Sequence, residues 1–314
     1  MPVSERPFRL VTRSDFDGLV CGVLLKEVNL IDEITFVHPK DMQDGKIVIS
    51  GRDITTNLPF VAGCHLAFDH HSSEFERAGE EIRTNHIIDP GALSAARVVY
   101  RFFGGQPNFP RISEEIMLAV DKADSAQFSI EEILRPDGWA LLNFLMDSRT
   151  GLGRFRQFRI SNYELMMKLI DFCRNHTVEE ILALPDVEER VELYQQHQTL
   201  FREQLLRCAQ VRRDVVVLDL RGEETIYAGN RFMIYALFPQ CRVSIHVLWG
   251  LKQQNTVFAV GKSIIDRSSP VDVGDICLSY GGGGHKAAGT CQIDNALAAA
   301  TLPELVARLG GPAH

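Results

Sequence analysis

The chain has 314 residues, a length that suits two domains better than one compact core. Its 33 basic and 41 acidic residues give a net charge of -8, which excludes a global positive field, so any nucleic-acid ligand must be short or locally held. The seven cysteines form no CxxC pair, which fits reduced thiols in a cytoplasmic protein. No apolar run reaches the ~18 residues of a membrane helix, so we expect no membrane partner.

The first 130 residues alternate between apolar β-type runs and helical patterns. The expected strands are 8–12, 34–38, 46–50 and 64–68, and the expected helices are 19–30, 92–103 and 113–121. Asp53 and Asp69 come just after two of these strands. Because ligands bind at the carboxyl ends of the strands in an open parallel sheet, we expect a mostly parallel α/β domain with a site at that edge.

The second half of the chain changes character. Strand patterns disappear over 155–211, and apolar residues at helical spacing predict a long amphipathic helix over 187–208, which we interpret as a packing or connecting helix. Beyond it, the sequence predicts strands at 214–220, 242–250 and 256–262 and a final helix at 301–309. We therefore expect a first domain over 1–186, a connecting helix over 187–211 and a smaller α/β domain over 212–314.

Acidic and histidine side chains recur at the expected strand ends. Each has an ordinary explanation, since aspartates cap helices and form turns and a lone histidine is usually structural. Together they favour a divalent metal site, because carboxylate oxygens and imidazoles suit Mn²⁺, Mg²⁺ or Zn²⁺. The candidates are Asp15, Asp17, Asp53, Asp69, His70, His71, Asp121 and Asp124.

A glycine run stands far from these residues, in the stretch SYGGGGHKAAGT over 279–290. Consecutive glycines let backbone N–H groups line an anion-binding surface, and His285 and Lys286 add donors beside it. A flexible surface loop is the alternative. The run is not a P-loop, because no Gly-Lys-Ser/Thr follows at the required spacing.

Five motifs in order resemble those of the DHH phosphoesterase family: SDFDG, a strand ending in Asp53, FDHHSS, VDKADS and GGGGHKAAG. The resemblance covers nearly the whole chain, with 1–186 similar to the DHH domain and 212–314 to the smaller DHHA1 domain. Family members include oligoribonucleases that also dephosphorylate 3'-phosphoadenosine 5'-phosphate, cyclic-dinucleotide phosphodiesterases and exopolyphosphatases. The resemblance implies a metal-dependent phosphoesterase for short oligonucleotides or small nucleotides. Such an enzyme is expected to bind one or two divalent ions, with Mn²⁺ preferred over Mg²⁺. A homodimer is compatible with the resemblance.

The resemblance also implies roles for residues of the first domain. Asp15 and Asp17 are expected to face different metals, with Asp53 bridging them. His70 is the expected ligand of the DHH motif, oriented by Asp69, while His71 faces the substrate phosphate. For the fourth motif, the resemblance favours Asp124 over Asp121.

In the expected DHHA1 domain, His285 resembles the family residue that grips the substrate phosphate or nucleotide. The surrounding glycines and lysine are expected to bind substrate with it: Gly282, Gly283, Gly284 and Lys286. Lys262 is a further candidate for a phosphate contact, although a solvated surface charge is the preferred interpretation.

Arg13 departs from the family pattern, because many members carry a metal-binding histidine at this position. A guanidinium only donates hydrogen bonds and stays charged, so it cannot ligate a cation. The site could then hold one ion firmly, recruit another ligand, or use Arg13 to bind the substrate phosphate. Two alternatives to a nucleotide phosphoesterase stay open: an exopolyphosphatase on the same scaffold, and a regulatory nucleotide-binding protein that has lost hydrolysis.

Overall fold

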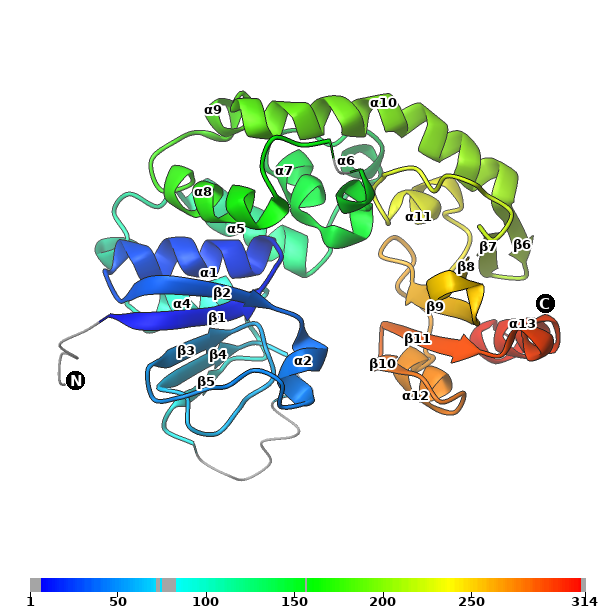
Figure 1. Cartoon of the computed structure of the whole chain (residues 1–314), viewed down its shortest axis with the longest axis horizontal. Coiled ribbons are helices and arrows are strands. Elements are labelled where there is room, and N and C mark those ends of the chain that lie inside the picture. The colour runs from blue at the N-terminus through cyan, green and yellow to red at the C-terminus, as the bar shows by residue number, and fades with distance from the viewer. Residues whose placement is uncertain (1–6, 72–73, 75–82, 156, 312–314) are drawn as a thin grey trace. The chain divides into compact units, whose positions relative to one another are not determined.

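The computed structural model describes residues 7–71, 74, 83–155 and 157–311, so Ser72 and Ser73 of the FDHHSS motif lie outside the described residues. The chain forms two compact units (Figure 1). The first unit comprises Met1–Gln127 and Pro136–Leu193, and the second comprises Phe128–Arg135 and Tyr194–His314. The long helix α10 (Pro185–Cys208) contributes to both, because the division falls between Leu193 and Tyr194.

The first unit is built on a five-stranded sheet in the order β2-β1-β3-β4-β5. Its strands are β1 (Phe8–Arg13), β2 (Ile31–Val37), β3 (Asp53–Thr56), β4 (Leu66–Asp69) and β5 (His86–Ile88). Every neighbouring pair is parallel, which confirms the predicted parallel sheet. All strand carboxyl ends therefore meet at one edge, the usual ligand-binding edge of such sheets.

Helices cover this sheet (Figure 1). The buried helix α1 (Phe16–Glu27) lies against β1 and packs against three helices: α4 (Ala95–Phe102), α5 (Glu114–Asp124) and α8 (Asn162–Phe172). Ser113 caps α5, since its Oγ accepts a hydrogen bond from Ile116 N at 3.3 Å. The other helices of the unit are α2 (Pro39–Gln43), α7 (Gly138–Met146) and α9 (Val178–Leu182).

The prediction of a strand over 46–50 is wrong. The third strand lies later in the sequence, at Asp53–Thr56. Residues 46–50 form no strand, and Val48 is 82% exposed, although Ile47 and Ile49 pack against a small apolar cluster around Val11. The place between β1 and β4 belongs to β3, which begins at Asp53. Asp53 therefore starts a strand instead of following one.

The second unit contains a six-stranded mixed sheet in the order β10-β11-β9-β8-β7-β6, in which only the β7–β8 pair is parallel. Its strands are β6 (Ala209–Arg212), β7 (Val215–Asp219), β8 (Val243–Trp249), β9 (Thr256–Lys262), β10 (Gly283–His285) and β11 (Ala288–Ile293). Its helices are α6 (Ile130–Leu134), α11 (Met233–Leu237), α12 (Val273–Leu278) and α13 (Asn295–Leu309). The expected second α/β fold is confirmed. None of the described helices is long and apolar enough to cross a membrane.

The close approach of α1 to the end of β1 generates a stability prediction. A Cβ at Gly18 would overlap the carbonyl oxygen of Arg13 and lie 2.8 Å from Thr12 Oγ1. Because backbone cannot move aside as a flexible side chain does, we expect Gly18→Ala to lower the free energy of unfolding by about 1–3 kcal/mol. Gly51→Ala is the matched control, since a Cβ there meets nothing within 4 Å. Thermal unfolding checks the prediction, and equal midpoints for the two variants would contradict it.

Candidate active site

The turn from β1 into α1 brings two carboxylates to the carboxyl edge of the sheet. Asp15 caps α1, and its Oδ1 accepts a hydrogen bond from Gly18 N at 3.0 Å. Asp17 is only 2% exposed, and its oxygens accept hydrogen bonds from Ala95 N at 3.0 Å and Ala96 N at 2.8 Å. These N–H groups begin α4, so the positive end of that helix fixes the buried carboxylate.

Three possible metal ligands converge beside this turn. Asp17, His70 and Asp124 each offer one ligand atom, and these atoms all lie within 4.8 Å of one another. His70 Nε2 is 2.8 Å from Asp124 Oδ2, but the two atoms are not aligned as a hydrogen bond. The other ring nitrogen of His70 contacts the carbonyl oxygen of Ala92 at 3.3 Å, the second contact typical of a metal-binding histidine. Two carboxylates and an imidazole fit a divalent ion such as Mn²⁺.

The electrostatics of this cluster favour a cation. Burial, together with the charge of Asp124, raises the pKa of Asp17 to about 8. Although burial opposes it, Asp124 raises the pKa of His70 to about 9, and Asp17 adds to this rise. Both shifts reflect negative charge that the surroundings solvate poorly. A bound divalent ion would stabilise the ionised carboxylates and the neutral imidazole together.

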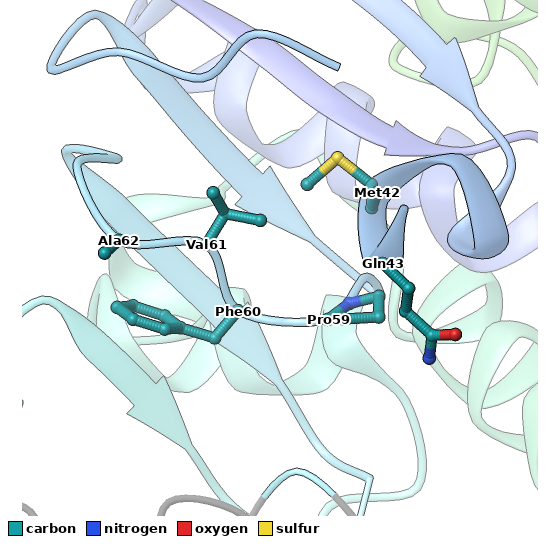
Figure 2. A pocket seen from close by; sticks show the side chains of 6 residues that line it. All are labelled: Met42, Gln43, Pro59, Phe60, Val61 and Ala62. Carbon is teal, nitrogen blue, oxygen red and sulfur yellow. The ribbon is translucent and has the colours of Figure 1, made fainter. Parts of the chain in front are cut away.

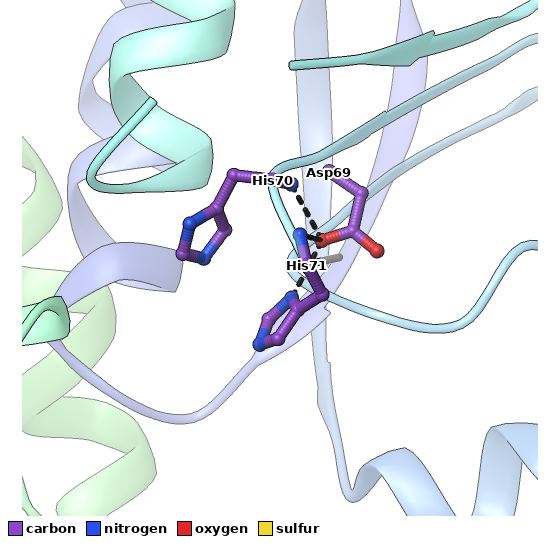
Figure 3. A group of neighbouring side chains, drawn as sticks. All are labelled: Asp69, His70 and His71. Carbon is purple, nitrogen blue, oxygen red and sulfur yellow. Dashed lines mark hydrogen bonds and ion pairs between the residues drawn. The ribbon is translucent and has the colours of Figure 1, made fainter. Parts of the chain in front are cut away.

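The two histidines of the DHH motif have different environments (Figure 3). Asp69 Oδ1 lies 2.7 Å from His71 Nδ1 and accepts the backbone N–H groups of His70 and His71 at 2.7 and 3.2 Å. The expectation that Asp69 orients the ring of His70 therefore needs correction, because the carboxylate lies at the sheet edge against the ring of His71. Asp69 thus fixes the ring of His71, whose side chain is 42% exposed and accessible to a ligand.

Arg13 and Asn57 surround Asp15. Arg13 Nε lies 2.9 Å from Asp15 Oδ2, and Asn57 Nδ2 donates to both oxygens of Asp15, at 3.3 and 3.4 Å. Asn57 directly follows β3, is buried, and leaves its Oδ1 without a hydrogen-bond partner. Asn57 is not among the candidates predicted from the sequence, although the β-branched run ITT before it is a strand signal that places it at the carboxyl edge.

Arg149 is a second arginine near the cluster that the sequence analysis did not identify. It lies in the turn Ser148–Thr150 after α7, where Asp147 Oδ1 accepts its Nε at 2.7 Å. Its side chain is 47% exposed, and its charge helps to counter the rise that burial causes in the pKa of Asp15. No local motif marks the position, since only the fold brings this turn toward Asp15 and Asp124.

Asp53 does not join the cluster. It pairs in register with Arg9 near the amino end of β1, and Arg9 Nε donates to its Oδ1 at 2.7 Å. Although burial opposes it, hydrogen bonds from Arg9 and Ser50 keep the pKa of Asp53 below its ordinary value. The predicted bridging ligand is thus at the opposite edge of the sheet, because β3 begins at this residue.

Asp121 is also engaged elsewhere, one helical turn before Asp124. Its oxygens accept hydrogen bonds from Ser94 Oγ at 2.7 Å and Arg97 Nε at 2.8 Å, so it fastens α5 to the start of α4. Of the two fourth-motif candidates, the structure brings Asp124 to His70.

In the second unit, part of the glycine run is explained by packing. A Cβ at Gly282 would overlap the carbonyl oxygen of Thr290, and one at Gly284 would overlap that of Ala288, so both glycines allow β10 to pack closely on β11. A Cβ at Gly283 would meet nothing within 4 Å. His285 and Lys286 are exposed.

Lys262 has a structural contact in the same unit. Its Nζ donates to the carbonyl oxygen of Val271 at 3.0 Å. This ammonium therefore ties the end of β9 to the segment before α12, in addition to any role toward a ligand.

A pocket of about 540 Å³ opens at the carboxyl edge of the first unit (Figure 2). One wall comes from the end of α2 and the other from the segment that follows Asn57, and the lining exposes both polar and apolar surface. The lining residues are Met42, Gln43, Pro59, Phe60, Val61 and Ala62. Since α2 follows β2 and Pro59 follows β3, the pocket walls start from the two strands that flank β1 and its terminal Arg13.

Comparison with known proteins shows similarity to solved structures over nearly the whole chain. The chain is 60% identical to a structure described as the pGpG-specific phosphodiesterase PggH from Vibrio cholerae, over 96% of this chain and 98% of that one, with a TM-score of 0.85. It shares the fold of CDC45 from Entamoeba histolytica at 9% identity, over 97% and 95% of the two chains, with a TM-score of 0.51. RecJ from Thermus thermophilus, in complex with Mn²⁺, matches at 14% identity over 96% and 51%, with a TM-score of 0.45. No protein-family model and no curated protein matches the chain.

The different positions of Asp53 and Asp124 generate a metal-binding prediction. We expect Asp53→Asn to retain Mn²⁺ affinity but to lower the free energy of unfolding by about 1–3 kcal/mol, because Arg9 loses its buried partner. Asp124→Asn is expected to lose most of the Mn²⁺ affinity, because it removes a charged ligand. Isothermal titration with Mn²⁺ and thermal unfolding measure the two effects. Loss of Mn²⁺ binding in a folded Asp53→Asn protein would contradict this placement.

Proposed function

Because the chain belongs to the DHH phosphoesterase family, we propose that this metal-dependent phosphoesterase hydrolyses the linear dinucleotide pGpG to GMP. The observation that carries the proposal is the 60% identity, over nearly all of both chains, with a pGpG-specific phosphodiesterase. A substrate with two nucleosides also agrees with the net charge of -8, which disfavours long polyanions.

We propose that Asp17, His70 and Asp124 hold Mn²⁺. The imidazole ligand suits Mn²⁺ better than Mg²⁺, which prefers oxygen ligands and water. When bound, the ion would activate a water molecule and stabilise negative charge on the phosphoryl oxygens. The hydrogen bonds from Ala95 N and Ala96 N hold Asp17 in place for this task.

Asp69, His71 and Arg13 would act on the substrate phosphate. Asp69 fixes the Nδ1–H tautomer of His71, which leaves Nε2 to face the phosphate or the leaving oxygen. Although burial opposes it, Asp69 raises the pKa of His71, so the imidazole can carry a proton to a leaving group. Arg13 would bind a non-bridging phosphoryl oxygen with the N–H groups that do not contact Asp15.

We assign recognition of the nucleotide ends to two further regions. The pocket between Met42 and Phe60 offers apolar side chains to a flat nucleobase, and the Gln43 amide can both donate to and accept from the base edge. In the domain over 212–314, exposed His285 and Lys286 can bind a terminal phosphate. The domain over 1–186 would carry out the hydrolysis.

A substrate panel tests the proposed function. With Mn²⁺, we expect rapid conversion of pGpG into GMP and at least about 100-fold lower kcat/KM for cyclic di-GMP, 3'-phosphoadenosine 5'-phosphate and polyphosphate, which do not present two linear nucleotides. Product chromatography measures each rate, and His70→Ala serves as the inactive control. Preferential release of inorganic phosphate from polyphosphate would instead identify an exopolyphosphatase.

The assigned role of His71 generates a separate prediction. His71→Asn should lower kcat for pGpG by about 100-fold or more, because the proton-carrying group is lost while the metal ligands remain. Mn²⁺ affinity should be unchanged by titration. The control variant is His176→Asn. His176 is exposed, and its ring Nδ1 lies 3.1 Å from the carbonyl oxygen of Phe172. A drop in kcat of less than tenfold for His71→Asn would reject the assigned role.

A further inference from the structure

Asp15 is already surrounded by hydrogen-bond donors. Its Oδ1 accepts from Gly18 N at 3.0 Å and Asn57 Nδ2 at 3.3 Å, while its Oδ2 lies 2.9 Å from Arg13 Nε. The ion pair with Arg13 places a fixed positive charge beside Asp15, which opposes a cation at this carboxylate. Asp17, His70 and Asp124 differ from it, because each offers one ligand atom and these atoms all lie within 4.8 Å of one another. Among the described residues, no arginine forms an ion pair with any of these three.

Among the described residues, the end of β3 beside Asp15 supplies no carboxylate that could bridge two ions. The residue at the carboxyl end of β3 is the neutral Asn57, whereas Asp53 is bound to Arg9 at the opposite edge. An amide oxygen is a weaker ligand than a carboxylate and brings no charge to offset a second divalent ion. Asn57 Oδ1 is buried without a hydrogen-bond partner, so it can still contact one ion or its bound water.

The net charge around the cluster also favours one ion over two. Asp69 pairs with His71, while Asp15, Asp17 and Asp124 bring three negative charges, which one divalent ion together with Arg13 neutralises. A second ion would leave excess positive charge beside the fixed guanidinium of Arg13, which cannot lose its proton. Arg149 adds no net charge, because Asp147 pairs with it.

We propose that this enzyme is a one-ion phosphoesterase in which Arg13 and Asn57 exclude a second ion and Arg13 supplies the missing positive charge. The proposal deepens the function given above. Asp17, His70 and Asp124 bind the ion, Asn57 fixes Asp15, and Arg13 turns its remaining N–H groups toward the phosphoryl oxygens. The two-ion arrangement that the family resemblance implies therefore does not fit these residues.

The test counts ions and needs no substrate, so a failure to cleave pGpG leaves it interpretable. The whole chain is stripped of metal, loaded with excess Mn²⁺ and desalted, and the bound Mn²⁺ is measured by mass spectrometry and electron paramagnetic resonance. We expect one ion per chain and the six-line spectrum of an isolated Mn²⁺ ion. Two ions per chain with an exchange-coupled spectrum would overturn the proposal.

A double variant tests the assigned cause. Arg13→His with Asn57→Asp supplies an imidazole and a bridging carboxylate, and we expect it to bind two Mn²⁺ ions with an exchange-coupled spectrum. Arg111→Gln is the matched control, because it removes a surface arginine that pairs with Glu27, and it should bind one ion. Thermal unfolding verifies that each variant is folded. A folded double variant that still binds one ion would overturn the role of Arg13 and Asn57.

The role of Arg13 toward substrate has its own readout in the same protein. With one ion bound, Arg13→Gln should raise KM for pGpG at least tenfold and lower kcat, while the Mn²⁺ count stays at one. Arg13→Lys should recover part of the loss, because it restores the charge without the two-pronged geometry. Unchanged KM and kcat in Arg13→Gln would show that Arg13 does not bind the phosphate.

Discussion

The buried carboxylate of Asp17 is the constraint on which the first unit depends. It sits in the first turn of α1, and two N–H groups at the start of α4 bind its oxygens. This contact joins α1, which follows β1, to α4, which follows β5, and so fixes the position of Asp17 within the cluster. Burial disfavours the ionised form of Asp17, and a bound cation would stabilise that form. The residue that joins the two helices therefore also favours cation binding.

The rest of the cluster follows from the parallel sheet. Since β1, β3 and β4 end at one edge, residues far apart in sequence meet there: Arg13, Asn57 and Asp69. Asp69 then separates the functions of the two histidines. By binding the ring of His71 and both backbone N–H groups, it leaves the ring of His70 free to turn toward Asp124.

Much of this arrangement could be predicted from the sequence, and the failures have identifiable physical causes. The strand and helix order, Asp15, Asp17 and the two histidines followed from apolar periodicity and local motifs. Asp53 failed because KIVIS alternates as a strand does, while the true strand DITT is short and rich in threonine. Asn57 was therefore not recognised, although it directly follows the strand that begins at Asp53. Arg149 could not be predicted, since only tertiary structure relates its turn to Asp15.

The exchange of an ion for an arginine has a chemical consequence. A metal ion can both ionise a water molecule and bind phosphoryl oxygens, whereas a guanidinium only donates hydrogen bonds, although in a fixed planar geometry. Activation of water must then rest on the single ion at Asp17, His70 and Asp124, and Arg13 becomes a directional anchor. Such an anchor accepts fewer phosphate orientations than a second ion does. A site with one ion and one arginine therefore fixes one phosphodiester in a defined position, which agrees with the proposed specificity for a small dinucleotide.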